Sequence, residues 1–270
     1  MRFLKKSIYR KRRAPRKRSA VGKKGSSVSV AVKKYVNRTI HKNVENKIKV
    51  LSGGFNFGSV SGSPTMNVIP MLPYTGNMLI DQGVKQGQRI GNTIKVRSLR
   101  FNYVLRPAVY DVTVNPAPVP CDIQMLFGNV KADPGLLPNA TDFQSLFQLG
   151  NTSSPPIGYL TDLIQPYNND YWDIRKTCLH KIGYSSITGT GGTASTQYLA
   201  NNDYKFNVVR KIDLTKQCPK TLKFDDTGTS ISGRNLYFMI QGVAANGVTL
   251  ASTSKPMSID FEVILEYEDA

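Results

Sequence analysis

The sequence predicts an all-β fold of two packed antiparallel sheets: a sandwich, a jelly roll or a barrel. Near the C-terminus, apolar residues from Ile259 to Tyr267 alternate with mostly polar ones, which is the pattern of a strand with one buried face. Long segments rich in Gly, Pro, Ser, Thr and Asn separate strands of this kind. Many strands with long loops and almost no helix are typical of antiparallel sandwiches.

Further strands are expected at residues 94–105, 121–127, 171–182, 204–214 and 236–243. In the first of these the apolar phase slips at Arg97 and Ser98, which predicts a β-bulge. The strand at 236–243 is apolar on both faces, so we expect it to be central and covered on both sides. A short connecting helix is predicted over 141–150, ending at a glycine.

Charge divides the chain into a cationic arm and a nearly neutral body. Residues 1–50 contain 18 of the 36 Lys and Arg but a single acidic residue, Glu45, of the 18. The net charge is therefore +17 in this part and +1 in the other 220 residues. A dense run of like charge repels itself and buries no apolar surface, so residues 1–27 are predicted to be a disordered arm. Residues 49–270 have the size of one domain.

Residues 28–48, between the arm and the body, are predicted to form an amphipathic basic helix or linker. Apolar side chains recur every fourth residue, at Val28, Val32, Val36, Ile40, Val44 and Ile48. These residues are all β-branched and therefore poor helix formers, so the helix is expected to form only when it is docked or its charge is neutralised.

The basic segments predict a strongly anionic partner, and we expect nucleic acid bound without sequence specificity. Each Lys or Arg that meets a phosphate releases condensed counterions, whatever the base sequence. The candidate phosphate-binding residues are Arg2, Lys5, Lys6, Arg10, Lys11, Arg12, Arg13, Arg16, Lys17, Arg18, Lys23, Lys24, Lys33, Lys34, Arg38 and Lys42. A solvated tail or a mitochondrial presequence is disfavoured. A presequence spaces its charges along an amphipathic helix, whereas here the basic residues are adjacent and Pro15 interrupts any helix.

Part of the same run also fits a nuclear import signal, which would be read by a host import receptor. Its residues are Lys11, Arg12, Arg13, Arg16, Lys17 and Arg18. The two roles are compatible.

The sequence predicts no catalytic residues, no cofactor and no metal. The only histidines are His41 and His180, and neither a CxxC nor an HxxxH spacing occurs. Cys178 and His180 are expected to share one strand face with Trp172, Ile174 and Ile182, which favours a buried core pair over a Cys/His nucleophile.

The acidic clusters and the cysteines are likewise not expected to form a metal site or an active site. The clusters Asp225/Asp226 and Glu266/Glu268/Asp269 are expected to be solvated rather than cation ligands. The three cysteines are expected to be reduced core thiols. The longest uncharged stretch is too polar for a transmembrane helix, so no membrane partner is expected.

The segment Ile80–Leu105 resembles the capsid proteins of small circular Rep-encoding single-stranded DNA viruses and the coat protein of satellite tobacco necrosis virus. The residues that carry the resemblance are Gln82, Gly83, Gly87, Arg89, Gly91, Ile94, Val96 and Ser98, preceded by the Arg-rich arm. A second similarity is the aromatic and basic run from Asp170 to Gly183.

The resemblance implies a single eight-stranded jelly roll that assembles with copies of itself into an icosahedral shell, about 60 copies in the minimal T=1 arrangement. It also implies that the arm lies inside on a genome of circular single-stranded DNA, and that the protein occurs in the virion and in the host nucleus. The alternative that the residues leave open is a non-viral β-sandwich protein that binds single-stranded nucleic acid without forming a shell.

Overall fold

The structure is a computed structural model, and it describes residues 29, 31–35, 46–60, 65–74, 78–85, 87–108, 119–183, 205–224, 231–247, 250–251 and 254–269. The chain divides into two compact units, Met1–Asn43 and Val44–Ala270. In the first unit, residues 31–35 are helical and their side chains are exposed. The predicted arm, residues 1–27, lies outside the described residues.

The boundary predicted at residue 48, between the amphipathic basic helix or linker and the body, is wrong. Residues 46–48 were expected to close the amphipathic helix, but they open strand β1 (Asn46–Phe57). Ile48 therefore does not continue an apolar helical stripe. It lies on the outer face of a sheet, paired in register with Glu266.

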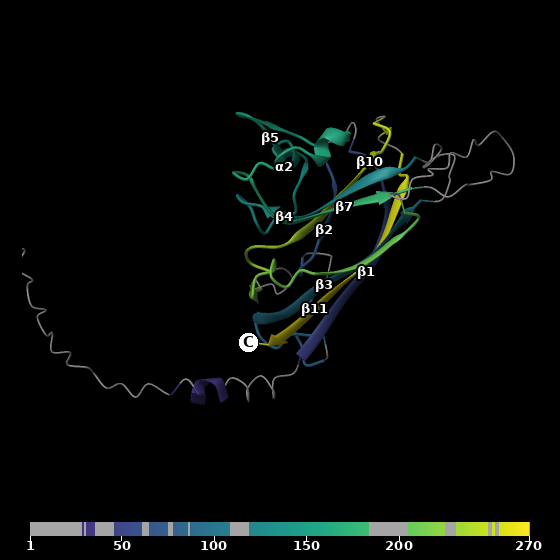
Figure 1. Ribbon diagram of the computed structural model, residues 1–270. Helices are drawn as coiled ribbons and strands as arrows, with labels where there is room; N and C mark the ends of the chain where they lie inside the picture. The colour runs from purple at the N-terminus through teal and green to yellow at the C-terminus, as the bar shows by residue number, and fades with distance from the viewer. Residues whose placement is uncertain are drawn as a thin grey trace, which may run out of the picture. The chain divides into compact units, whose positions relative to one another are not determined.

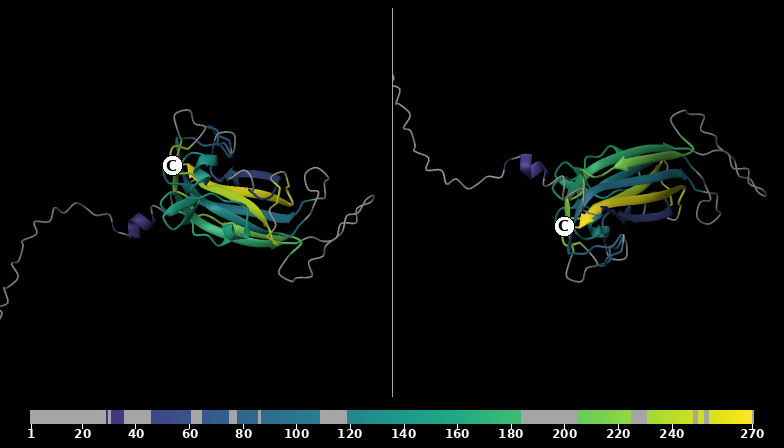
Figure 2. Two further views of the ribbon diagram at one scale, coloured as in Figure 1. Left: turned by 90° about the horizontal axis from the view of Figure 1, so that it is seen from above. Right: turned by 90° about the horizontal axis from the view of Figure 1, so that it is seen from below.

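Two antiparallel sheets are stacked face to face, each with a main order of four strands, and one of them has a fifth, short strand (Figure 1, Figure 2). Sheet A has the order β1, β11 (Met257–Asp269), β3 (Thr93–Pro107) and β8 (Val208–Asp213), with the short β9 (Thr221–Lys223) also beside β3. Sheet B has the order β2 (Asn67–Pro70), β10 (Tyr237–Ala244), β4 (Cys121–Val130) and β7 (Trp172–Ile182). Apart from the steps from β4 to β7 and from β8 to β9, the chain alternates between the sheets, which is jelly-roll connectivity. The predicted eight-stranded jelly roll is confirmed.

The inner faces of the two sheets bury one large apolar core. Its centre is aromatic: the ring centroids of Phe101 and Phe238 lie 4.8 Å apart, and those of Phe127 and Phe238 lie 5.3 Å apart. These rings come from β3, β10 and β4, so they join sheet A to sheet B. Tilted aromatic contacts of this kind add to the free energy that area burial supplies.

Two β-bulges decide which side chains enter this core. In β3, Ser98 pairs with Glu266 while Val96 pairs with Tyr267, so Arg97 is the extra residue and the predicted bulge is confirmed. In β7, Lys176 pairs with Phe127 while Ile174 pairs with Gly128, so Arg175 is extra. The expectation that Trp172 shares a face with Cys178 and His180 is therefore wrong, because one inserted residue exchanges the two faces of the strand.

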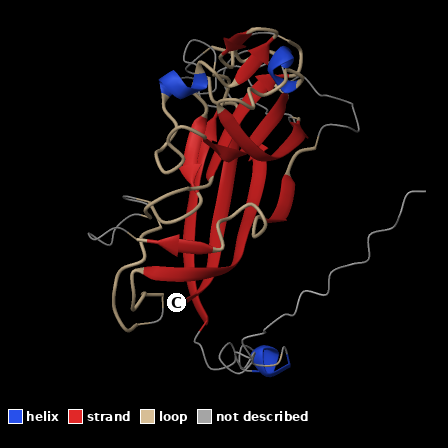
Figure 3. Cartoon of the chain, turned by 90° about the vertical axis from the view of Figure 1, so that its left-hand side faces the viewer, coloured by secondary structure: helices blue, strands red, loops and turns tan. Residues whose placement is uncertain are grey.

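A long insertion between β4 and β7 covers the outer face of sheet B (Figure 1, Figure 3). It contains α2 (Ala140–Phe143), β5 (Phe147–Leu149), β6 (Thr152–Ser154) and the 3-10 helix η1 (Leu160–Leu163). Phe143, Phe147 and Trp172 pack there against Leu126 and Met239 in a second core. All eight residues of β10 are buried as a result, which confirms the prediction of a central strand covered on both sides.

The helix predicted over 141–150 is shorter than expected. It begins at the capping box of Asn139 and Asp142, but the chain becomes strand β5 at Phe147. The strand expected over 204–214 is also shorter, because β8 spans only Val208–Asp213.

A buried polar network ties the insertion to sheet B. Asp162 Oδ2 accepts hydrogen bonds from the backbone N–H groups of Ile157 (2.9 Å) and Gly158 (2.7 Å). Gln124 Nε2 donates to the Asp162 backbone oxygen, and Gln241 Nε2 donates to Gln124 Oε1 at 2.7 Å. Asp162 is fully buried and its Oδ1 has no hydrogen-bond partner. Burial therefore raises its pKa, although the backbone hydrogen bonds and Gln241 lower it.

Asp162→Asn should make stability less dependent on pH. Because the folded-state pKa of Asp162 lies above its ordinary value of 3.8, the protonated carboxyl stabilises the fold fully below pH 3.8, and this contribution is lost as pH rises through the folded-state pKa. We expect the difference in free energy of unfolding, variant minus wild type, to shift in favour of the variant between about pH 3 and about pH 7. Urea unfolding measures this, with the exposed Asp170→Asn as control. A difference that does not change with pH would contradict it.

Candidate assembly and nucleic-acid-binding surfaces

The segment that carries the viral resemblance folds as a corner before β3. The backbone N–H of Arg89 donates to the Asp81 oxygen at 2.9 Å, and that of Gly83 donates to the Arg89 oxygen at 2.8 Å. The Arg89 guanidinium is buried, lies 4.3 Å from the centre of the Phe224 ring, and donates to Asn92 Oδ1 at 3.0 Å. The arginine of this motif therefore has a structural role rather than a role in phosphate binding.

The glycines of the corner permit its tight course. Gly87 has a φ of +81°, a left-handed conformation that glycine adopts without strain. A Cβ on Gly83 would lie 2.2 Å from the Gln88 side-chain oxygen.

Lys47 joins this corner to the C-terminal strand and was not recognised from the sequence. Its Nζ donates to the Gln88 backbone oxygen at 2.7 Å and to Asp269 Oδ2 at 2.6 Å. The Lys47 side chain is 2% exposed, and Asp269 Oδ1 also accepts from the Ile90 N–H. One buried ion pair thus connects β1, the corner and β11.

The outer face of sheet A carries charge that is paired across strands. Arginines of β3 form ion pairs with carboxylates of β11, namely Arg97 with Glu268, Arg100 with Glu266 and Arg106 with Asp260. The expectation that Glu266, Glu268 and Asp269 are simply solvated is wrong, because each forms an ion pair. Asp225 and Asp226 lie outside the described residues.

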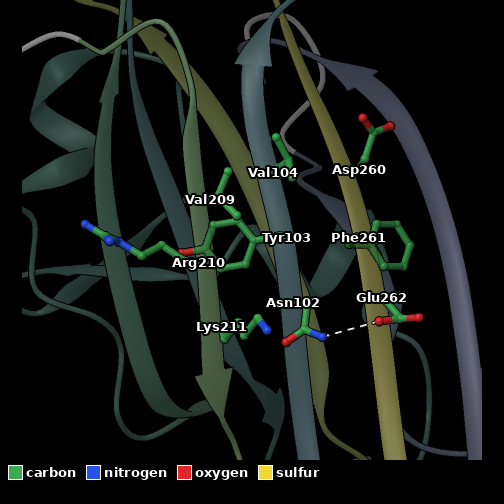
Figure 4. A pocket seen from close by; sticks show the side chains of 9 residues that line it. All are labelled: Asn102, Tyr103, Val104, Val209, Arg210, Lys211, Asp260, Phe261 and Glu262. Carbon is green, nitrogen blue, oxygen red and sulfur yellow. Dashed lines mark hydrogen bonds between the residues drawn. The ribbon is translucent and has the colours of Figure 1, made fainter.

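A shallow hollow on this face lies between β8, β3 and β11 (Figure 4). Asn102 Nδ2 donates to Glu262 Oε2 across it at 3.3 Å. The hollow brings no group together that could catalyse a reaction. Among the described residues, no cluster of three or more His, Cys, Asp and Glu could hold a metal ion.

Most of the predicted nucleic-acid-binding residues lie outside the described part of the chain. Lys33 and Lys34 are exposed on the helical residues 31–35. The others lie outside the described residues: Arg2, Lys5, Lys6, Arg10, Lys11, Arg12, Arg13, Arg16, Lys17, Arg18, Lys23, Lys24, Arg38 and Lys42. The proposed import signal is among them.

Cys178 and His180 form part of the fold rather than a nucleophile and its base. His180 Nε2 and Tyr103 Oη lie 2.8 Å apart, which joins β7 to β3 across the sandwich. Burial raises the pKa of the Cys178 thiol, so a reactive thiolate is disfavoured. Cys121 and Cys218 are buried and unpaired, and burial raises the pKa of Cys218 to about 12. These two side chains are the expected core thiols.

Sequence reasoning missed a local excess of positive charge on the body. Residues 205–223 contain six Lys and Arg but one acidic residue, Asp213, and the average over the body conceals this. Burial lowers the pKa of His180, and the positive charges of Arg210 and Lys205 lower it further. The excess of Lys and Arg in residues 205–223 can be counted from the sequence, but the sequence does not show that this segment lies beside β7.

Comparison with known proteins gives structural neighbours. No protein-family model matches the chain, and no curated protein sequence matches it. Among solved structures it is similar to VP1 of Trichodysplasia spinulosa-associated polyomavirus, with 12% identity, coverage of 82% of this chain and 95% of that one, and a TM-score of 0.27. It is also similar to the unassembled VP1 pentamer of Merkel cell polyomavirus, with 12% identity, coverage of 84% and 97%, and a TM-score of 0.25.

The described part of the chain contains no helix of the length and apolar character that crossing a bilayer requires.

Lys47→Met should destabilise the body by about 3 kcal/mol, because it leaves the Asp269 carboxylate without its buried partner. Asp269→Asn should cost a similar amount, and the double variant much less than the sum. Urea unfolding of dissociated protein measures these values. Lys49→Met is the matched control, because Lys49 is also directed inward on β1 but forms no ion pair within the described part of the chain. Strictly additive losses would contradict the pairing.

Arg210→Ala should raise the pKa of His180, since it removes a positive charge that opposes protonation. His180 destabilises the fold as pH falls below its ordinary value of 6.5, so the variant should also lose less stability in acid. NMR titration of the histidine ring protons measures the change, and Lys255→Ala is the control. An unchanged titration would contradict the contact.

Proposed function

We propose that this chain is a viral capsid protein that assembles into a small icosahedral shell and packages single-stranded nucleic acid, favouring circular DNA, through its basic N-terminal arm. The observation that carries the proposal is the segregation of charge. Residues 1–50 hold a net charge of +17, whereas the arginines of β3 are already paired with carboxylates of β11.

A body of low net charge is what a shell protein needs. Copies with a net charge of +1 can pack side by side without mutual repulsion, whereas copies with +18 could not. About 60 arms would bring about a thousand positive charges to the interior, enough to neutralise a genome of about a thousand phosphates. The jelly roll supplies a rigid unit to which such an arm can be attached.

Exposed apolar side chains on the insertion support contacts between copies. Ile157, Tyr159, Leu160 and Ile164 are clustered in sequence around η1, and Ile164 is 82% exposed. Large apolar groups that remain exposed on one surface of a monomer are typical of protein interfaces.

Replacing the twelve Lys and Arg of residues 1–24 by Gln should abolish packaging and leave the fold intact. The expected result is that wild-type particles carry nucleic acid and particles of the variant do not. The ratio of absorbance at about 260 and 280 nm, electron microscopy and circular dichroism measure content, assembly and fold.

Two outcomes would overturn the proposal. One is nucleic-acid content that is unchanged in the variant. The other is a wild-type chain that stays monomeric at every concentration and salt tested. Digestion of the packaged strand with DNase or RNase distinguishes the two kinds of genome.

A further inference from the structure

We propose that the body carries a second polyanion site, separate from the arm, which binds the phosphate backbone of single-stranded nucleic acid. The site, named here the β7–β8 edge, consists of Lys176, Lys205, Arg210 and Lys216, with the exposed ring of Phe206. The choice of nucleic acid as the polyanion rests on the proposed function.

The two strands of this edge each end a sheet and lie on the same side of the sandwich. β7 is the last strand of sheet B, and β8 is the last strand of the main order of sheet A. Lys205 meets the end of β7, where its N–H donates to the Lys181 oxygen and its own oxygen accepts from the Gly183 N–H. At the other end, the Arg175 guanidinium of β7 donates to the Gln217 backbone oxygen. Basic residues of both strands therefore form one surface.

The positive charges of this edge are only partly balanced by the body. One carboxylate, Asp213, lies near two of them: hydrogen bonds from Thr215 lower its pKa, and the charges of Lys176 and Lys216 lower it further. Within the described part of the chain, no carboxylate forms an ion pair with Lys176, Lys205, Arg210 or Lys216. The arginines of β3 on the outer face of sheet A differ in this respect, since three of them have carboxylate partners. A cluster of like charge destabilises the fold through self-repulsion, and binding of an anion would remove that repulsion.

The chemistry of the edge fits a phosphodiester strand. Arg210 extends away from the hollow of Figure 4. It is paired in register with Tyr103, so its side chain lies on the side of β8 that faces sheet B. Phe206 is 58% exposed next to Lys205. An exposed aromatic ring between cations offers a surface on which an unpaired base can stack while the cations contact phosphates. Positive potential along this edge also accounts for part of the lowered pKa of His180.

The test compares two full-length triple variants that remove equal charge. The edge variant is Lys205→Gln/Arg210→Gln/Lys216→Gln, and the control is Lys85→Gln/Lys95→Gln/Lys255→Gln, whose residues are exposed elsewhere on the body. Binding of dissociated protein to a mixed-sequence single-stranded DNA oligonucleotide is measured against salt concentration. We expect the edge variant to reduce the salt slope by about 2 and the affinity by about 50-fold at 0.15 M salt, from about 0.7 counterion per contact. The control should change neither appreciably.

A second readout is chemical acylation of lysines followed by mass spectrometry. Single-stranded DNA should protect Lys176, Lys205 and Lys216, but not Lys85, Lys95 or Lys255. Equal losses of affinity in the two triple variants, or no protection of the edge, would overturn the inference while leaving packaging by the arm intact. Protection by heparin but not by DNA would also overturn it, since the partner would then be a sulfated glycan. Protection that arises only on assembly without nucleic acid would assign the edge to contacts between copies and overturn it too.

Discussion

The pairing of β11 with β3 is the interaction on which the rest of the body depends. These two long strands are paired from Met257–Pro107 to Asp269–Ile94, and they form the middle of sheet A. Their inner residues supply much of the core, and their outer residues supply the ion pairs that neutralise the arginines of β3. The last residue of the pairing, Asp269, also binds Lys47 and the corner that precedes β3. This one strand pair thus determines the packing of the core, the balance of charge on the outer face, and the position of the corner before β3.

This arrangement explains how a chain of net charge +18 can have a stable core. Nearly all of the excess lies in residues 1–50, and much of what remains in the body is balanced locally. The exception is the β7–β8 edge, where cations from two sheets form no ion pair within the described residues and Asp213 is the carboxylate near Lys176 and Lys216. We infer that the same polyanion satisfies both the arm and this edge, so that the body contributes to packaging as well as to the shell.

The sequence predicted the features that depend on local periodicity. The alternation of β11, the two-sided burial of β10 and the bulge at Arg97 could each be read from neighbouring residues. The bulge at Arg175 could not be predicted from the sequence, because the alternation of apolar and polar residues in β7 shows no break there. Lys47 was missed because its partner Asp269 is 222 residues away in the chain. The end of the predicted helix was wrong because β-branched residues at every fourth position also fit a strand. The resemblance to coat proteins of small circular single-stranded DNA viruses stays a prediction.

In the proposed particle the body forms the shell and the cationic arm lies inside it. Limited trypsin digestion of intact and dissociated particles tests this arrangement, because trypsin cleaves after Lys and Arg, and residues 1–24 contain twelve of them, none followed by Pro. We expect the arm to survive in intact particles and to be removed at once when they are dissociated. Removal at the same rate in both states, with the particles remaining closed, would contradict it.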